Sequence, residues 1–326
     1  MIEHRSSQTC FTGIVADALC KRHVTGAGHP ESPARYDAVM NGLDARGLLA
    51  SLIPVESRPA TEDELLLCHT RGYVKQIREA ILRGAEELDA GDTPVCPDSW
   101  EAGLRAAGGV FNAVDAMMEG KIRNAFCAVR PPGHHAGAER AMGFCFLNNV
   151  ALAARYAQAR HNLEKVLIVD WDVHHGNGTQ DIFYEDGSVF FFSIHQSPWY
   201  PGTGLAHETG AAAGKGTTLN CPFPAGAGAK EIFHAFQLKL VPAADAFKPD
   251  LVLISAGFDS RIGDPLGDFT LTDADFAELT EIVAGIARKH SGGRLVSVLE
   301  GGYNLHGLAD AACSHVKALM TVVTRS

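Results

Sequence analysis

Five short apolar runs recur along the chain, and each gives way to polar or aromatic residues at its C-terminal end. The runs lie at residues 124–129, 166–170, 188–194, 250–255 and 295–299. Runs of this length between charged segments are typical of strands buried on both faces of a parallel sheet. Helix-like stretches lie between them, at residues 144–160, 230–247 and 273–290, and a further one precedes the first run, at residues 100–120. The alternation predicts an α/β fold, with helices covering both faces of a parallel sheet.

The residues that follow these runs carry the candidate chemistry. Parallel strands present their carboxyl ends at one edge of a sheet, so side chains from distant segments can meet there. The set that could converge is His134, His135, Asp172, His174, Asp259 and Tyr303. Carboxylate oxygens with imidazole nitrogen suit zinc, and iron or cobalt nearly as well. A lone Asp-x-His segment would be explained better by turn or helix-cap residues, but the recurrence at several strand ends favours a site.

Composition narrows the class of protein. The candidate residues run from 134 to 303 with no linker rich in Ser, Pro or Gly, so we expect one domain over residues 1–326. The net charge of −10 argues against nucleic-acid binding, which relies on Lys and Arg. An acidic surface would suit cationic substrates, although solubility explains it equally well.

The eight cysteines include no C-x-x-C pair, and several lie in apolar surroundings, which is typical of reduced thiols in the cytoplasm. No secretory signal or bilayer-spanning run is evident, so we expect a cytoplasmic protein without a membrane partner. The sequence leaves a homo-oligomer open.

Eight short motifs lie in order between residues 29 and 305. They are His29-Pro-Glu-Ser-Pro-Ala-Arg35, Arg130-Pro-Pro-Gly-His-His-Ala136, Met142-Gly-Phe-Cys145, Asp170-Trp-Asp-Val-His-His-Gly-Asn-Gly178, Tyr200-Pro-Gly-Thr-Gly204, Ala256-Gly-Phe-Asp259, Gly263-Asp-Pro-Leu-Gly267 and Glu300-Gly-Gly-Tyr-Asn-Leu305. With these eight motifs together, the chain resembles the zinc-dependent histone deacetylase family. Within that family it resembles the class II-like branch, which includes bacterial histone deacetylase-like amidohydrolases and acetylpolyamine amidohydrolases. The resemblance implies a single-domain arginase–deacetylase fold, with a mainly parallel eight-stranded sheet flanked by helices.

The resemblance also implies an activity, which is hydrolytic removal of acetyl or other acyl groups from N-acetyl-lysine side chains. Asp172, His174 and Asp259 would be the metal ligands, for zinc or, in the cell, iron. Three protein ligands leave a position for water, as in catalytic zinc sites. Tyr303 would donate its hydroxyl to the oxyanion that develops on the acyl group.

The tandem histidines would have different partners in the family pattern. Asp170 would bond His134, and Asn177 would bond His135. A carboxylate favours the imidazolium and an amide does not, so we expect His135 to be the more neutral ring and the general base. His134 would supply orientation and electrostatics. The resemblance further implies a structural potassium ion, held by Asp170, Asp172, His174, Ser193 and Ile194.

Aromatic walls of a substrate tunnel are expected beside the metal. Phe144 and Tyr200 match them, with Gly143 beside Phe144 in the same substrate-binding set, and a narrow aromatic tube suits the methylene stem of lysine. Many family members have Phe where Tyr200 stands. Leu266 matches a position at the pocket mouth.

Two further assignments stay open at this level. Asp92 and Asp98 are both candidates for the carboxylate at the tunnel rim that fixes a peptide backbone. Arg35 matches a basic residue behind the metal that handles acetate, and a structural ion pair explains it equally well.

Three rival functions are weighed against a lysine deacetylase. A ureohydrolase would need a second metal with Asp at positions 176 and 261, where this chain has Gly176 and Arg261. A non-enzymatic reader of acyl-lysine is disfavoured because the catalytic set is complete. An acetylpolyamine amidohydrolase survives as the alternative, although such relatives carry an acidic residue in place of Leu266.

Overall fold

Eight strands form one sheet in which every pairing is parallel. The computed structural model describes residues 11–88 and 91–322. The strand order is β2-β1-β3-β8-β7-β4-β5-β6. The strands are β1 (Thr12–Val15), β2 (Ile53–Val55), β3 (Asn124–Cys127), β4 (Val166–Asp170), β5 (Val189–Gln196), β6 (Thr218–Phe223), β7 (Leu251–Ala256) and β8 (Leu295–Leu299). The predicted eight-stranded parallel sheet is therefore confirmed, and the five predicted runs correspond to β3, β4, β5, β7 and β8.

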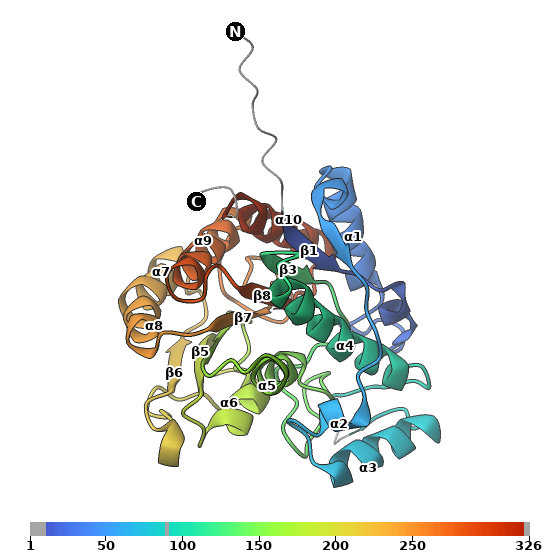
Figure 1. Cartoon of the computed structure of the whole chain (residues 1–326). Coiled ribbons are helices and arrows are strands. Elements are labelled where there is room, and N and C mark those ends of the chain that lie inside the picture. The colour runs from blue at the N-terminus through green and yellow to red at the C-terminus, as the bar shows by residue number, and fades with distance from the viewer. Residues whose placement is uncertain (1–10, 89–90, 323–326) are drawn as a thin grey trace.

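Helices cover both faces of this sheet (Figure 1). They are α1 (Ala34–Ala45), α2 (Glu62–Leu65), α3 (Arg71–Leu82), α4 (Ser99–Met118), α5 (Asn149–His161), α6 (Asn177–Phe183), α7 (Ala229–Ala235), α8 (Val241–Phe247), α9 (Asp273–His290) and α10 (Leu305–Val322). None of the helices that the structure describes has the length and apolar character to cross a bilayer.

The core is divided by the sheet, as the alternation of side chains in β4 shows. Leu167 and Val169 pack into one cluster, under α1 and α7 to α10. Val166 and Ile168 face the opposite cluster, under α3, α4 and α5. All four side chains are fully buried, which explains why this strand is a continuous apolar run.

Two predicted helices differ from those observed. The stretch 144–160 becomes α5 only from Asn149, because Gly143 and Phe144 both adopt left-handed backbone, with φ of 56° and 69°. The stretch 230–247 is divided into α7 and α8 by a π-helical turn at Phe236–Leu240. The stretch 273–290 matches α9 at both ends.

Candidate active site

Four neighbouring strands at the centre of the sheet deliver the predicted site residues at their carboxyl ends. The order β3-β8-β7-β4 places the loop of His134 and His135 beside that of Tyr303, followed by those of Asp259 and of the Asp172 segment. Residues that are up to 169 positions apart are thus gathered by strand order alone, as expected for the edge of a parallel sheet.

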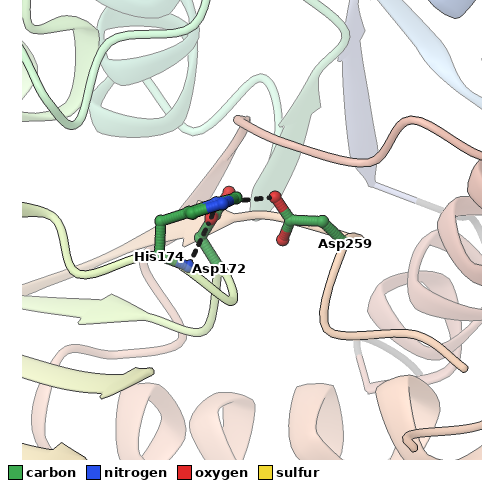
Figure 2. Close-up of side chains that lie close together, drawn as sticks. All are labelled: Asp172, His174 and Asp259. Atoms are coloured by element: carbon green, nitrogen blue, oxygen red, sulfur yellow. Dashed lines mark hydrogen bonds and ion pairs between the residues drawn. The ribbon is translucent and has the colours of Figure 1, made fainter. Parts of the chain in front are cut away.

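Asp172, His174 and Asp259 form a compact cluster (Figure 2). Their ligand atoms all lie within 4.8 Å of one another. The Nδ1 atom of His174 is 3.0 Å from an oxygen of Asp172 and 3.3 Å from an oxygen of Asp259. Both carboxylates are fully buried, so the cluster is a candidate metal centre on the described residues.

The chemistry of this donor set fits a metal ion. The Oδ2 atom of Asp259 is buried, and apart from the 3.3 Å contact with Nδ1 of His174 it has no hydrogen-bond partner among the described residues. Burial, with the charge of Asp172 adding to it, raises the pKa of the Asp259 carboxyl to about 7. A cation would relieve both costs, because buried charges are normally paired or bind metals. Gly301 has no side chain, and this leaves room for the two carboxylates, since a Cβ at position 301 would collide with Asp259 and Asp172.

The tandem histidines have the expected partners. Nδ1 of His134 lies 3.0 Å from Oδ2 of Asp170. Nδ1 of His135 lies 2.7 Å from Oδ1 of Asn177, whose amide group is oriented by a 3.5 Å contact from Nδ2 to the sulfur of Met142. An amide oxygen can only accept, so Nδ1 of His135 carries the proton and its Nε2 is left as a proton acceptor.

The two rings differ in charge. Burial opposes protonation of His134, but the carboxylates of Asp172 and Asp170 outweigh it and raise the pKa of His134 to about 10. Burial and the neighbouring charges of His134 and His174 hold the pKa of His135 well below its ordinary value. At neutral pH the structure therefore places a cationic ring beside a neutral one.

Glu300 belongs to the site although sequence reasoning assigned it no role. Its Oε2 accepts hydrogen bonds from the backbone N–H of Gly133 (2.7 Å) and of His134 (3.2 Å), and its Oε1 accepts one from the Ser255 hydroxyl (3.1 Å). Burial raises the pKa of Glu300 to about 7, against the opposing charge of His134. An acidic residue directly after the run 295–299 was the available signal.

A cavity of about 250 Å³ leads to this cluster from the surface. Its lining includes the four residues predicted for the tunnel, together with His135, His174 and Tyr303. The lining is Asp92, His135, Gly143, Phe144, His174, Trp199, Tyr200, Leu266 and Tyr303. The ring of Phe144 meets the ring of Tyr303 edge-on at 5.9 Å, which makes a narrow aromatic wall.

Of the two rim candidates, only Asp92 lines the cavity. Its carboxylate accepts hydrogen bonds from the Gly143 N–H (2.9 Å) and from the Tyr200 hydroxyl (2.6 Å). Asp98 lies at the N-cap position of α4, where its side chain makes no capping hydrogen bond, and it pairs with Arg22 at 3.5 Å.

Arg35 is fully buried behind Tyr303. Its guanidinium donates to the carbonyls of Gly302 (2.7 Å) and Glu300, pairs with Glu31 at 3.1 Å, and lies 5.0 Å from the centre of the Tyr303 ring. The structural ion pair is therefore present, and the same side chain also supports the loop that carries Tyr303.

The residues predicted to hold a monovalent cation lie close together at the ends of β4 and β5. Asp170 is paired with Ser193 in the register of β4 and β5, and Ile194 follows directly. Asp170, Asp172, Ser193 and Ile194 are fully buried. A monovalent cation at this place stays a prediction.

A parallel α/β sheet with a buried Asp/His/Asp cluster and a histidine pair at its carboxyl edge is the arrangement of a hydrolase with a candidate metal centre. Residues 29–319 match the family model described as "Histone deacetylase domain", so the chain belongs to the histone deacetylase family. This confirms the family resemblance, and the family is one of hydrolytic deacetylases.

Relatives support the assignment over nearly the whole chain. "Histone deacetylase-like amidohydrolase" of Pseudomonas aeruginosa is 38% identical over 311 residues, covering 90% of this chain and 82% of that protein. "Polyamine deacetylase HDAC10" of Homo sapiens is 41% identical over 301 residues, covering 89% of this chain but 44% of that protein. The solved structure titled "Crystal Structure of HDA15 HD domain" superposes with a TM-score of 0.91 at 39% identity, covering 96% of this chain and 89% of that one.

Proposed function

We propose that the protein is a zinc-dependent deacetylase that acts on Nε-acetyl-lysine in peptides or proteins. The observation that carries the proposal is the cavity of about 250 Å³, whose lining combines the aromatic side chains of Phe144, Trp199 and Tyr200 with His135, His174 and Tyr303. Such a cavity would carry an acyl amide to the candidate metal centre while the rest of the substrate stays outside.

Asp172, His174 and Asp259 would hold the metal. A divalent ion bound there supplies Lewis acidity to the acyl carbonyl and to a water molecule. The donor set suits zinc and also iron, and zinc is our proposal. A potassium ion beside Asp170 is proposed as a structural ion.

The chain's own groups would then move the protons. Neutral His135 accepts a proton from the attacking water at Nε2 and later passes it to the leaving amine. Cationic His134 stays protonated and provides positive charge beside it. Burial raises the pKa of Tyr303 well above its ordinary value, so its hydroxyl remains a donor for the developing oxyanion.

Acetylpolyamine hydrolysis is the second candidate, because two relatives are named "Polyamine deacetylase HDAC10". Leu266 at the cavity lining favours acetyl-lysine over it. A polyamine would bring a second ammonium group against this apolar side chain, at a desolvation cost. We therefore predict that Leu266→Glu shifts selectivity toward acetylpolyamines, because a charge pair at a partly buried mouth is stronger than one in water.

One assay tests both candidates. Purified zinc-loaded protein is given an acetyl-lysine peptide, longer acyl-lysine peptides, acetylspermidine and acetylputrescine, and kcat/KM is measured for each. The proposal expects the acetyl-lysine peptide to be preferred by the wild type. A wild-type ratio that favours the acetylpolyamines would reject the lysine assignment and establish the alternative.

The cellular setting is also proposed rather than observed. The cysteine pattern supports a cytoplasmic enzyme, although some relatives are named chloroplastic. The acidic balance supports a protein or small amine partner rather than nucleic acid. A homo-oligomer remains compatible with the chain.

A further inference from the structure

A series of hydrogen bonds runs along one side of the cavity mouth. The backbone N–H of Tyr303 donates to Asp264 Oδ2 at 2.7 Å, and the N–H of Leu266 donates to Asp264 Oδ1 at 3.0 Å. The carbonyl of Leu266 in turn accepts from Nε1 of Trp199 at 2.9 Å. The loop of the oxyanion donor is thereby joined to the loop of the opposite aromatic wall.

The series continues round the other side. Tyr200, which follows Trp199, donates its hydroxyl to Oδ2 of Asp92 at 2.6 Å. Oδ1 of Asp92 accepts from the Gly143 N–H at 2.9 Å, and the carbonyl of Asp92 accepts from the Phe144 N–H at 3.2 Å. The edge contact between the rings of Phe144 and Tyr303 joins the two ends of this series, so that the contacts surround the cavity mouth. We name these residues the collar: Asp92, Gly143, Phe144, Trp199, Tyr200, Asp264, Leu266 and Tyr303.

Asp92 occupies a special place in the collar because it holds both aromatic walls. On one side it bonds two successive N–H groups of the left-handed turn at Gly143 and Phe144, a conformation that is unfavourable for phenylalanine. On the other side it bonds Tyr200. Of the hydrogen bonds named here, the one between Tyr200 and Asp92 is the only one that joins two side chains.

We propose that the Tyr200 hydroxyl and the Asp92 carboxylate lock the collar, and that this lock holds the tunnel mouth in the width and shape that receive the substrate stem. The lock rests on the proposed function in its choice of substrate and of a metal-binding ligand for its test. A phenylalanine at position 200 would keep the wall but could not close the collar, so the hydroxyl makes Tyr200 a positioning residue for binding. The bond is charge-assisted and short, the kind that contributes most.

A double-mutant cycle tests the lock. Wild type, Tyr200→Phe, Asp92→Asn and the double variant are compared in zinc-loaded protein, with kcat and KM measured for an acetyl-lysine tripeptide. The Kd of an alkyl hydroxamate, which has a straight stem and no peptide backbone, is measured by calorimetry. Each single variant should raise KM and Kd about ten-fold, the scale of one hydrogen bond to a charged group, with kcat nearly unchanged.

The double variant should be no more than about two-fold worse than the poorer single variant, because both substitutions act on the same charge-assisted bond: Tyr200→Phe removes the donor, and Asp92→Asn removes the charge of the acceptor. The lock would be overturned if the fold-changes in KM and Kd of the two single variants multiply in the double variant. It would also be overturned if Tyr200→Phe has the KM and Kd of wild type. Tyr200→Phe decides the matter alone if Asp92→Asn does not fold.

Matched controls are Tyr184→Phe and Asp98→Asn, which make the same chemical changes outside the cavity lining. Both should leave KM and Kd unchanged. Suppose that the four proteins bind the hydroxamate with non-additive effects of the two substitutions, but wild type hydrolyses no acetyl-lysine. The lock then stands and the proposed function fails. If it hydrolyses acetyl-lysine but the effects multiply, the proposed function stands and the lock fails.

Discussion

Glu300 offers the sharpest test of how the site is held together. Glu300→Gln can keep every hydrogen bond of the native side chain. Its amide oxygen can accept from the N–H groups of Gly133 and His134, and its amide nitrogen can donate to the Ser255 hydroxyl. Glu300→Ala removes the acceptor altogether. The pair of variants therefore separates the charge of Glu300 from its hydrogen bonds.

The structure sets the size of each effect. Glu300→Ala leaves two buried N–H groups unpaired, at about 1–3 kcal/mol each, so the free energy of unfolding should fall by about 2–6 kcal/mol at pH 5, where Glu300 is protonated. The fall should be smaller at pH 8, because ionisation of Glu300 lowers the stability of wild type there. The effect of Glu300→Gln on the free energy of unfolding depends on pH. Because burial raises the pKa of Glu300 from 4.5 to about 7, wild type loses stability as pH rises from 4.5 through 7. The loss is about 3 kcal/mol in full.

Glutamine does not ionise, so it mimics the protonated acid. Glu300→Gln should match wild type near pH 4.5 and be more stable by up to about 3 kcal/mol above pH 7. Urea unfolding of metal-depleted protein at pH 5 and pH 8 measures this, since a bound cation would itself stabilise the carboxylate. Glu119→Gln, at an exposed ion pair with Lys121, is the control and should leave the difference between the two pH values unchanged. The reasoning would be refuted if Glu300→Gln and Glu300→Ala lower the free energy of unfolding equally at pH 8.

Three further predictions concern the chemistry. Asp259→Ala should abolish both metal retention, measured by elemental analysis, and activity, whereas full activity in metal-free protein would contradict the mechanism. Tyr303→Phe should lower kcat by roughly 10²–10³ with unchanged metal content, and a variant within a few-fold of wild type would leave Tyr303 as a packing residue. His135→Ala should lower kcat more than His134→Ala at several pH values, because only His135 is a neutral base; the reverse order would exchange their roles.

The central strands could be predicted from the sequence because each is buried on both faces. β4 and β7 are continuous apolar runs, and strand order then brought their terminal residues together. The edge strand β2 has three residues, one of them Pro54, and its side chains are not buried. Nothing in its local pattern separates it from a loop, since it becomes a strand only by pairing with β1.

The start of α5 shows a different limit. The predicted helix includes residues 144–148, yet Gly143 and Phe144 turn left-handed, with their N–H groups bonded to Asp92 from 51 and 52 residues away. A partner so remote leaves no mark on the local pattern. The partners of Glu300 are equally remote, since its Oε2 accepts from the N–H groups of Gly133 and His134, which lie 167 and 166 residues away.

The division of labour between the histidines also arises from distant contacts. His134 and His135 are adjacent and have the same side chain, so no local pattern can distinguish their charge. Against the burial that opposes protonation, the carboxylates of Asp172 and Asp170 raise the pKa of His134, whereas burial and the charges of His134 and His174 lower the pKa of His135. Asn177, at the start of α6, accepts the proton that His135 carries on Nδ1 and so leaves Nε2 as the basic nitrogen. A motif can therefore mark where the chemistry takes place, but the roles within it depend on which elements the sheet places behind each ring.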